Sequence, residues 1–173
     1  MKLFKNQHHD RPILTVKPKL IDTIMEVGGY IALIALWVYV WICYNLLPDI
    51  VPTHFGAGGV VDGYGEKELT FIAPVIATCL FVFMAYMQRK PHLFNYTVAI
   101  TEENALLQYT TAVRMMRVLK MCICFVFIAG EYTTNTAAFS GSNVVDSKWM
   151  FFVIIFLVQL PVFWFLIKSS KNA

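Results

Sequence analysis

Four apolar runs, separated by shorter polar segments, set the pattern of this chain of 173 residues. A helix that crosses a bilayer needs about 20 consecutive, mostly apolar residues, and each run has a length of that order. The pattern predicts spans over residues 24–47, 69–87, 118–138 and 149–167. We therefore expect an all-α integral membrane protein, built as a four-helix bundle.

The predicted membrane domain covers residues 24–173 and follows a polar, basic arm of residues 1–23. Pro12 and Pro18 prevent this arm from forming one continuous helix. No small-residue cleavage site precedes the first apolar run, so we interpret that run as a retained anchor rather than a removed signal peptide.

Composition supports the membrane interpretation. Hydrophobic residues make up 58% of the chain and charged residues only 14%, whereas an ordinary soluble domain carries about 25% charged residues. A soluble enzyme domain, a disordered chain and a nucleic-acid-binding module are excluded on this ground. The four cysteines all lie inside the apolar runs, which argues against a disulfide framework.

The basic residues are distributed unevenly between the polar segments. The arm, residues 89–90, residues 114–120 and the C-terminal segment carry most of them, while the intervening loops carry only Lys67 and Lys148. Cytoplasmic segments of membrane proteins are enriched in lysine and arginine. The distribution therefore predicts that both termini are cytoplasmic and that the loop between the first two spans is external.

That outer loop, residues 48–67, is rich in glycine and proline. Its glycines permit sharp backbone turns, and Asp62-Gly63 is a turn signal. The loop can therefore fold back and bring His54, Asp62 and Lys67 together. We consider two interpretations, a compact cap in which Asp62 pairs with Lys67, and a binding site for a ligand.

Glu131 is an ionisable residue in the outer part of the third predicted span. Such residues are costly in a bilayer and indicate functional sites. One interpretation is an ion pair with Lys67, or a protonated carboxyl group hydrogen-bonded within the bundle. The other is a polar cavity under the outer loop that holds His54, Asp62 and Glu131. Those three side chains could bind a divalent metal ion or relay a proton, and no other cofactor is indicated.

The third predicted helix begins near Thr101 and continues without a glycine or proline to Gly130. It is longer than a bilayer core is thick, so its first part is predicted to extend into the cytoplasm. Arg114, Arg117 and Lys120 recur every three residues along it, which predicts a basic stripe that binds anionic lipid headgroups.

The cytoplasmic linker and the start of this helix carry many hydrogen-bonding side chains. They could form a surface that binds a protein partner, or they could tie the linker to the ends of the helices. The candidate residues are His92, Asn95, Tyr96, Asn104, Gln108 and Tyr109.

The outer loop reads Pro-x-x-x-Pro-x-His-Phe from Pro48 and Gly-x-x-Asp-Gly-Tyr-Gly-x-Lys from Gly59. In this position after a first span, the two motifs resemble the bacterial membrane family called domain of unknown function 1648. Residues 91–96 are similar to a second stretch of such proteins, whereas Gly56 replaces the asparagine expected after His-Phe. The resemblance implies a bacterial cytoplasmic (inner) membrane. The domain also occurs in immunity proteins of the sporulation-delaying-protein toxin system, and the family implies no reaction.

These observations favour a non-enzymatic protein with a protective, immunity or sensing role at the envelope. We expect an external ligand such as a peptide at the outer loop, a protein partner or anionic lipid at the cytoplasmic face, and no nucleic acid. An alternative is an ion-coupled or metal-binding transporter subunit around Glu131, which four short spans would accommodate only as a homo-oligomer. Another is a membrane enzyme with His54 and Glu131 as acid and base, although no nucleophile, zinc-protease or phosphate-loop motif is present.

Overall fold

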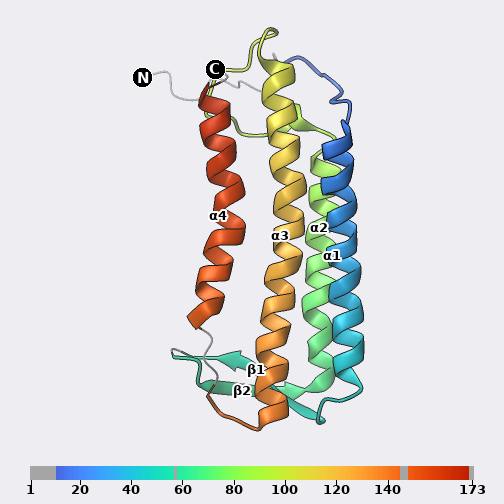
Figure 1. The fold of residues 1–173 in the computed structure, drawn as a ribbon, viewed down its shortest axis with the longest axis vertical. Coiled ribbons are helices and arrows are strands. Elements are labelled where there is room, and N and C mark those ends of the chain that lie inside the picture. The colour runs from blue at the N-terminus through green and yellow to red at the C-terminus, as the bar shows by residue number, and fades with distance from the viewer. Residues whose placement is uncertain (1–10, 57, 145–147, 172–173) are drawn as a thin grey trace.

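The computed structural model describes residues 11–56, 58–144 and 148–171. Long helices run side by side along its long axis, and a short β-hairpin closes one end (Figure 1). These helices are α1 (Leu20–Tyr44), α2 (Ile72–Met87), α3 (Ala105–Ser140) and α4 (Lys148–Lys171). The predicted all-α class is confirmed.

Three segments of the described chain are long and apolar enough to cross a membrane: Leu20–Tyr44, Lys67–Met87 and Phe152–Lys171. The protein is therefore a membrane protein with several candidate spans. The helix α3 is not among them, because Arg117, Lys120 and Glu131 interrupt its apolar stretch. That α3 also crosses the bilayer stays a prediction, although it packs against each of the other three helices.

The long central helix α3 begins later than predicted. Thr101 and Asn104 bond to each other, each side chain accepting from the other residue's backbone N–H at 3.3 and 2.9 Å, and this closes a turn before Ala105. From there α3 continues without interruption to Ser140. It ends at Gly141, which adopts the left-handed conformation (φ 62°) that commonly terminates helices.

The outer loop forms a hairpin that the sequence pattern did not predict. Strand β1 (Ile50–Phe55) pairs antiparallel with β2 (Val61–Glu66), and the 3₁₀ helix η1 (Lys67–Phe71) leads into α2. The turn contains Gly58 and Gly59, both at φ near 80°, a conformation that glycine adopts without a steric penalty. Gly63 serves a different purpose, because a Cβ atom there would lie 2.9 Å from the Cβ atom of His54.

The hairpin is bonded to the segment that follows α3. The backbone N–H of Val61 donates to the carbonyl of Asn143 at 2.8 Å, and the hydroxyl of Tyr64 donates to the Asn143 side chain at 2.8 Å. Val60 and Val144 form an isolated β-bridge. The hairpin thus lies as a cover across the end of the bundle.

The buried core lies where α1, α2 and α3 meet. One cluster contains Ala32, Phe81 and Cys124, and another contains Leu36, Val40 and Ala77. Many large apolar side chains on the outer faces of α1, α2 and α4 are exposed, as expected for surfaces that face lipid tails.

The other end of the bundle holds the start of α1, the link between α2 and α3, and the end of α4 (Figure 1). The link contains the 3₁₀ helix η2 (Pro91–Leu93). Here α4 is fixed to α3, because the Gln108 amide donates to the Ser169 carbonyl at 2.9 Å and the Ser169 hydroxyl donates back at 2.7 Å. The arrangement separates the predicted cytoplasmic segments from the hairpin.

Cysteine labelling tests the predicted orientation. Thr97→Cys and Ser142→Cys are placed singly in a chain whose four native cysteines are replaced. Both positions are exposed, Thr97 in the link that precedes α3 and Ser142 in the segment that follows α3. An impermeant maleimide added to intact cells should label Ser142→Cys and leave Thr97→Cys unlabelled until the cells are opened, because basic segments stay inside. Labelling of Thr97→Cys in intact cells would contradict this orientation.

Candidate functional site

At the end of the bundle that is predicted to be cytoplasmic, which we call the inner end, the basic side chains of α3 pair with acids of α1. Arg114 Nε donates to Asp22 Oδ1 at 2.7 Å, and Arg117 Nη1 lies 3.1 Å from the same oxygen. Arg117 Nε donates to Glu26 at 3.2 Å, and Lys120 Nζ also pairs with Glu26. We call these residues the inner ion-pair network.

The third helix of this network is α2. Gln88 at its end donates from Nε2 to Glu26 at 3.1 Å. Lys120 is fully buried, with its ammonium group 4.6 Å from the centre of the Phe81 ring, a favourable cation–π position. The network therefore joins α1 and α3 through charged side chains, and α2 through the neutral Gln88 amide and the Phe81 ring.

The predicted headgroup-binding stripe is wrong for Arg117 and Lys120, since both side chains are buried in the network. Arg114 stays partly exposed but is bonded to Asp22. A buried cation is costly unless an anion and hydrogen-bond acceptors compensate it, and α1 supplies two carboxylates one helical turn apart. That spacing of two acids at the start of α1 was the sequence signal for this network.

Most of the predicted cytoplasmic surface is internal packing. Tyr109 is fully buried and donates to the carbonyl of Pro12 at 3.1 Å, while Tyr96 donates to Pro91 at 3.0 Å. Arg11 lies 5.4 Å over the Tyr96 ring and donates to the carbonyl of Phe94 at 2.6 Å. Burial raises the pKa of both tyrosine hydroxyls above its usual value.

The other four residues of the predicted cytoplasmic surface behave differently from one another: two are bonded to the protein and two are wholly or partly exposed to solvent. Gln108 is fully buried against Ser169, and Asn104 donates to the carbonyl of Ala99 at 3.0 Å. His92 is half-buried and Asn95 is exposed. The structure favours the interpretation in which these side chains tie the linker to the helix ends, and binding of a protein partner stays a prediction.

At the opposite end, the hairpin brings His54 and Asp62 together. His54 Nδ1 lies 2.5 Å from Asp62 Oδ1, and both side chains are largely exposed. The predicted pair of Asp62 with Lys67 is wrong. Lys67 instead donates to Asp49 at 2.9 Å, because the strand register places these two residues together at the base of the hairpin.

Glu131 lies on α3 beneath the hairpin and is only 6% exposed. Its Oε2 atom is buried and accepts no hydrogen bond among the described residues. The predicted pair of Glu131 with Lys67 is therefore also wrong. Asn135, one turn further along α3, is likewise buried, with neither side-chain polar atom bonded in the part of the chain that is described.

A cavity of about 610 Å³ lies between the hairpin, α3 and α4. We call it the outer cavity. Its lining combines strand residues, apolar helix residues and three polar groups of α3; among them are His54, Phe55, Gly130, Glu131, Thr134 and Ile154. Glu131 also borders a second cavity of about 310 Å³ between the hairpin, α2 and α3.

The structure thus places His54 and Glu131 on the walls of one cavity, while Asp62 contacts His54 from the neighbouring strand. It does not assemble the three as metal ligands. Within residues 11–56, 58–144 and 148–171, no group of three histidine, cysteine, aspartate or glutamate side chains is placed to hold a metal ion.

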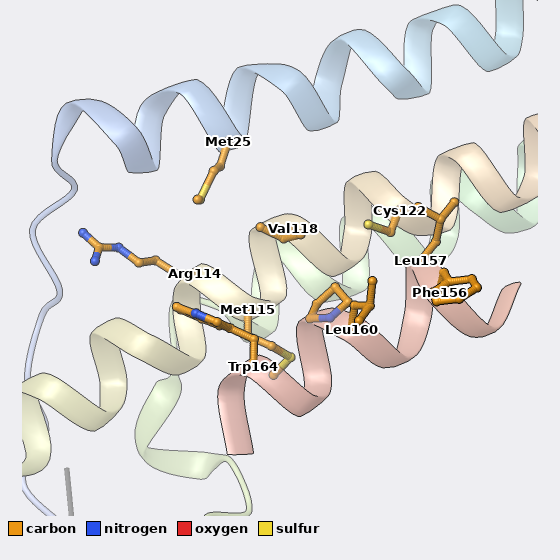
Figure 2. Close-up of a pocket in the computed structure, with 10 residues that line it drawn as sticks. Met25, Arg114, Met115, Val118, Cys122, Phe156, Leu157, Leu160 and Trp164 are labelled. Carbon is orange, nitrogen blue, oxygen red and sulfur yellow. The ribbon is translucent and has the colours of Figure 1, made fainter. Parts of the chain in front are cut away.

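Two further cavities lie toward the inner end. One, of about 450 Å³, separates the arm from the inner ion-pair network and is lined by Thr15, Glu26 and Arg117, among others. The other, of about 380 Å³, is an apolar groove between α1, α3 and α4. Figure 2 shows Met25 of α1, Val118 of α3 and Trp164 of α4 around this groove, with Arg114 near one end.

Comparison with known proteins addresses the motif of the hairpin. Residues 31–78 match the model of the family described as "Domain of unknown function (DUF1648)". The predicted family resemblance is confirmed. The DUF1648 segment covers most of α1, the hairpin and the start of α2, so it includes His54 and Asp62 but not Glu131.

The similarity extends beyond this segment in one curated relative. An uncharacterized protein of Archaeoglobus fulgidus is 29% identical over 155 residues, which cover 81% of this chain and 82% of that protein. No solved structure matches the chain. The bacterial source of this chain stays a prediction.

Proposed function

We propose that this protein binds an external ligand in the outer cavity and acts, without catalysis, in protection, immunity or sensing at the envelope. The observation that carries the proposal is a cavity of about 610 Å³, roofed by the hairpin and lined by apolar and polar side chains. Binding pockets for small ligands have volumes of about 300–1,000 Å³. The uneven distribution of basic residues supports an orientation in the cytoplasmic membrane in which the cavity is external and both termini are cytoplasmic.

The exposure of the His54–Asp62 pair supports binding rather than catalysis. Both side chains lie largely in water on the hairpin, whereas acid–base catalysis needs a group held against the reacting atoms in a shielded site. On an exposed rim, the pair is better placed to contact an incoming ligand.

The walls of the outer cavity favour a peptide ligand. Phe55, Phe127 and Ile154 offer apolar surface, while Thr53 and Thr134 offer hydroxyl groups. The hairpin above can also contact an extended backbone. The occurrence of the DUF1648 domain in immunity proteins against a peptide toxin, implied by the family resemblance, supports the same ligand class.

Transport is a second candidate function, favoured by the buried, unbonded oxygen of Glu131. Intramembrane carboxylates of this kind often carry protons or ions. Proteoliposomes test it: a pH gradient that collapses faster with the wild type than with Glu131→Gln would support transport. Equal rates would leave ligand binding as the proposed function.

Filling the outer cavity tests ligand binding. Gly130 lines the cavity, and a Cβ atom at this position would meet no atom within 4 Å. Gly130→Phe should therefore fold, helped by about 0.5 kcal/mol of helix propensity, and occupy the ligand's space. Bacteria that express the wild type should survive at least one member of a panel of synthetic membrane-active peptides, and Gly130→Phe should remove that protection.

Gly130→Ala is the matched control, because it also raises helix propensity but adds little volume, and it should protect as the wild type does. Equal protection by Gly130→Phe and the wild type would show that the outer cavity is not the binding site. A wild type that protects against no peptide of the panel would contradict the protective role.

A further inference from the structure

The proposed binding cavity contains an acid without a counter-charge. Glu131 is more than nine-tenths buried, and its Oε2 atom accepts no hydrogen bond from the described residues. A carboxylate removed from water is stable only when a donor or a cation compensates it. The side chain lines both cavities under the hairpin, so a ligand in either of them can reach it.

The basic side chains described at this end have other partners. Lys67 donates to Asp49 at 2.9 Å, and His54 lies 2.5 Å from Asp62. The three cations of the inner ion-pair network contact Asp22 and Glu26 at the far end of α1. The ligand itself is therefore the natural source of the positive charge that Glu131 lacks.

The chemistry of the lining indicates which cation fits. Hard metal ions require several oxygen ligands, and the described residues around Glu131 do not provide a metal-binding group. The cavity instead surrounds a single carboxylate with apolar side chains such as Phe127, Val126 and Met150. Such a site suits one positive charge carried on an apolar body.

We propose that Glu131 recognises a primary ammonium group, as found on a lysine side chain or a peptide N-terminus, whose apolar remainder fills the outer cavity. This inference rests on the proposed function, because it assumes that a ligand enters the cavity. Asp62 at the rim adds a second negative group on the path of an approaching cation.

A pair of probes with equal apolar tails tests the inference. Purified wild-type protein in nanodiscs is incubated with octylammonium or with 1-octanol, and the modification of Glu131 by a hydrophobic carbodiimide is followed by mass spectrometry. Octylammonium should slow the modification about tenfold more than octanol does, which is the size expected for a close charge pair. Equal effects of the two probes would overturn the ammonium proposal.

Two variants separate this proposal from the proposed function. Thermal melting of Glu131→Gln should show equal shifts with the two probes, while the wild type should be shifted more by octylammonium. The melting temperature of Gly130→Phe should change with neither probe, because the phenylalanine side chain fills the cavity. Equal thermal stabilisation of the wild type by the two probes would overturn ammonium recognition but keep the binding cavity. No thermal stabilisation by either probe would overturn both proposals.

Discussion

Glu26→Gln is expected to lower the free energy of unfolding in detergent by about 3 kcal/mol, because it strands a buried cation. Lys120 is fully buried and pairs with Glu26. Arg117 loses one of its two carboxylate partners in the same variant. With a total stability of about 5–15 kcal/mol for a typical protein, this loss is readily measured by denaturant titration.

The double variant Glu26→Gln/Lys120→Met should recover most of the loss, since a neutral apolar side chain replaces the stranded ammonium group. Asp49→Asn is the matched control: it removes one acid from the exposed pair with Lys67 and should cost under about 1 kcal/mol. A loss in Glu26→Gln no larger than that of Asp49→Asn would show that the inner ion-pair network does not stabilise the bundle.

Gly29→Leu is expected to destabilise the bundle by about 1–3 kcal/mol through overpacking. A Cβ atom at Gly29 would lie 3.2 Å from Phe81 Cε2 and 3.6 Å from the Cε atom of Lys120. The larger side chain must therefore separate α1 from α2 and α3, at the level where the inner ion-pair network begins. Thermal melting in detergent measures the effect.

The adjacent Gly28 offers a matched control. A Cβ atom there meets only the sulfur of Met121, at 3.2 Å, which is part of a flexible side chain that can move aside. Gly28→Leu should therefore cost less than Gly29→Leu, although both gain the same helix propensity. Equal melting temperatures of the two variants would contradict the close approach of the helices at Gly29.

Hydropathy alone predicted the long helices. Each helix carries a long apolar run, which must be either buried in the protein or placed against lipid. The helix that contains the first predicted span begins at Leu20, four residues before residue 24. In the structure Asp22 lies inside α1 and is only 1% exposed, compensated by two arginines of α3. The cost of a charge depends on its partners, which hydropathy does not include.

Local sequence patterns did not predict the strands of the hairpin or the partners of its charged side chains. Its strands are short, β1 contains Pro52, and β2 alternates with glycine, so strand propensity is weak. The motif residues did indicate that the loop folds back on itself. The partners of Asp62 and Lys67 could not be predicted, because they depend on the strand register rather than on spacing.

The candidate site was only partly accessible from the sequence. The cost of an acid in a membrane helix identified Glu131, and the loop motif identified His54 and Asp62. The unbonded Oε2 atom and the cavity volume required the packing of three elements that are distant in the chain: β1, α3 and α4.

The inner ion-pair network also sets an order for biogenesis. Arginine and lysine oppose the insertion of a membrane helix, by about 2.5–3.5 kcal/mol each at its centre and by less near its ends, and Arg117 and Lys120 lie at the start of the predicted span of α3. The carboxylates that neutralise them belong to α1, which is synthesised first. On the prediction that α3 crosses the bilayer, we expect its stable entry to require that α1 is already in place, so that the first helix would assist the assembly of the third.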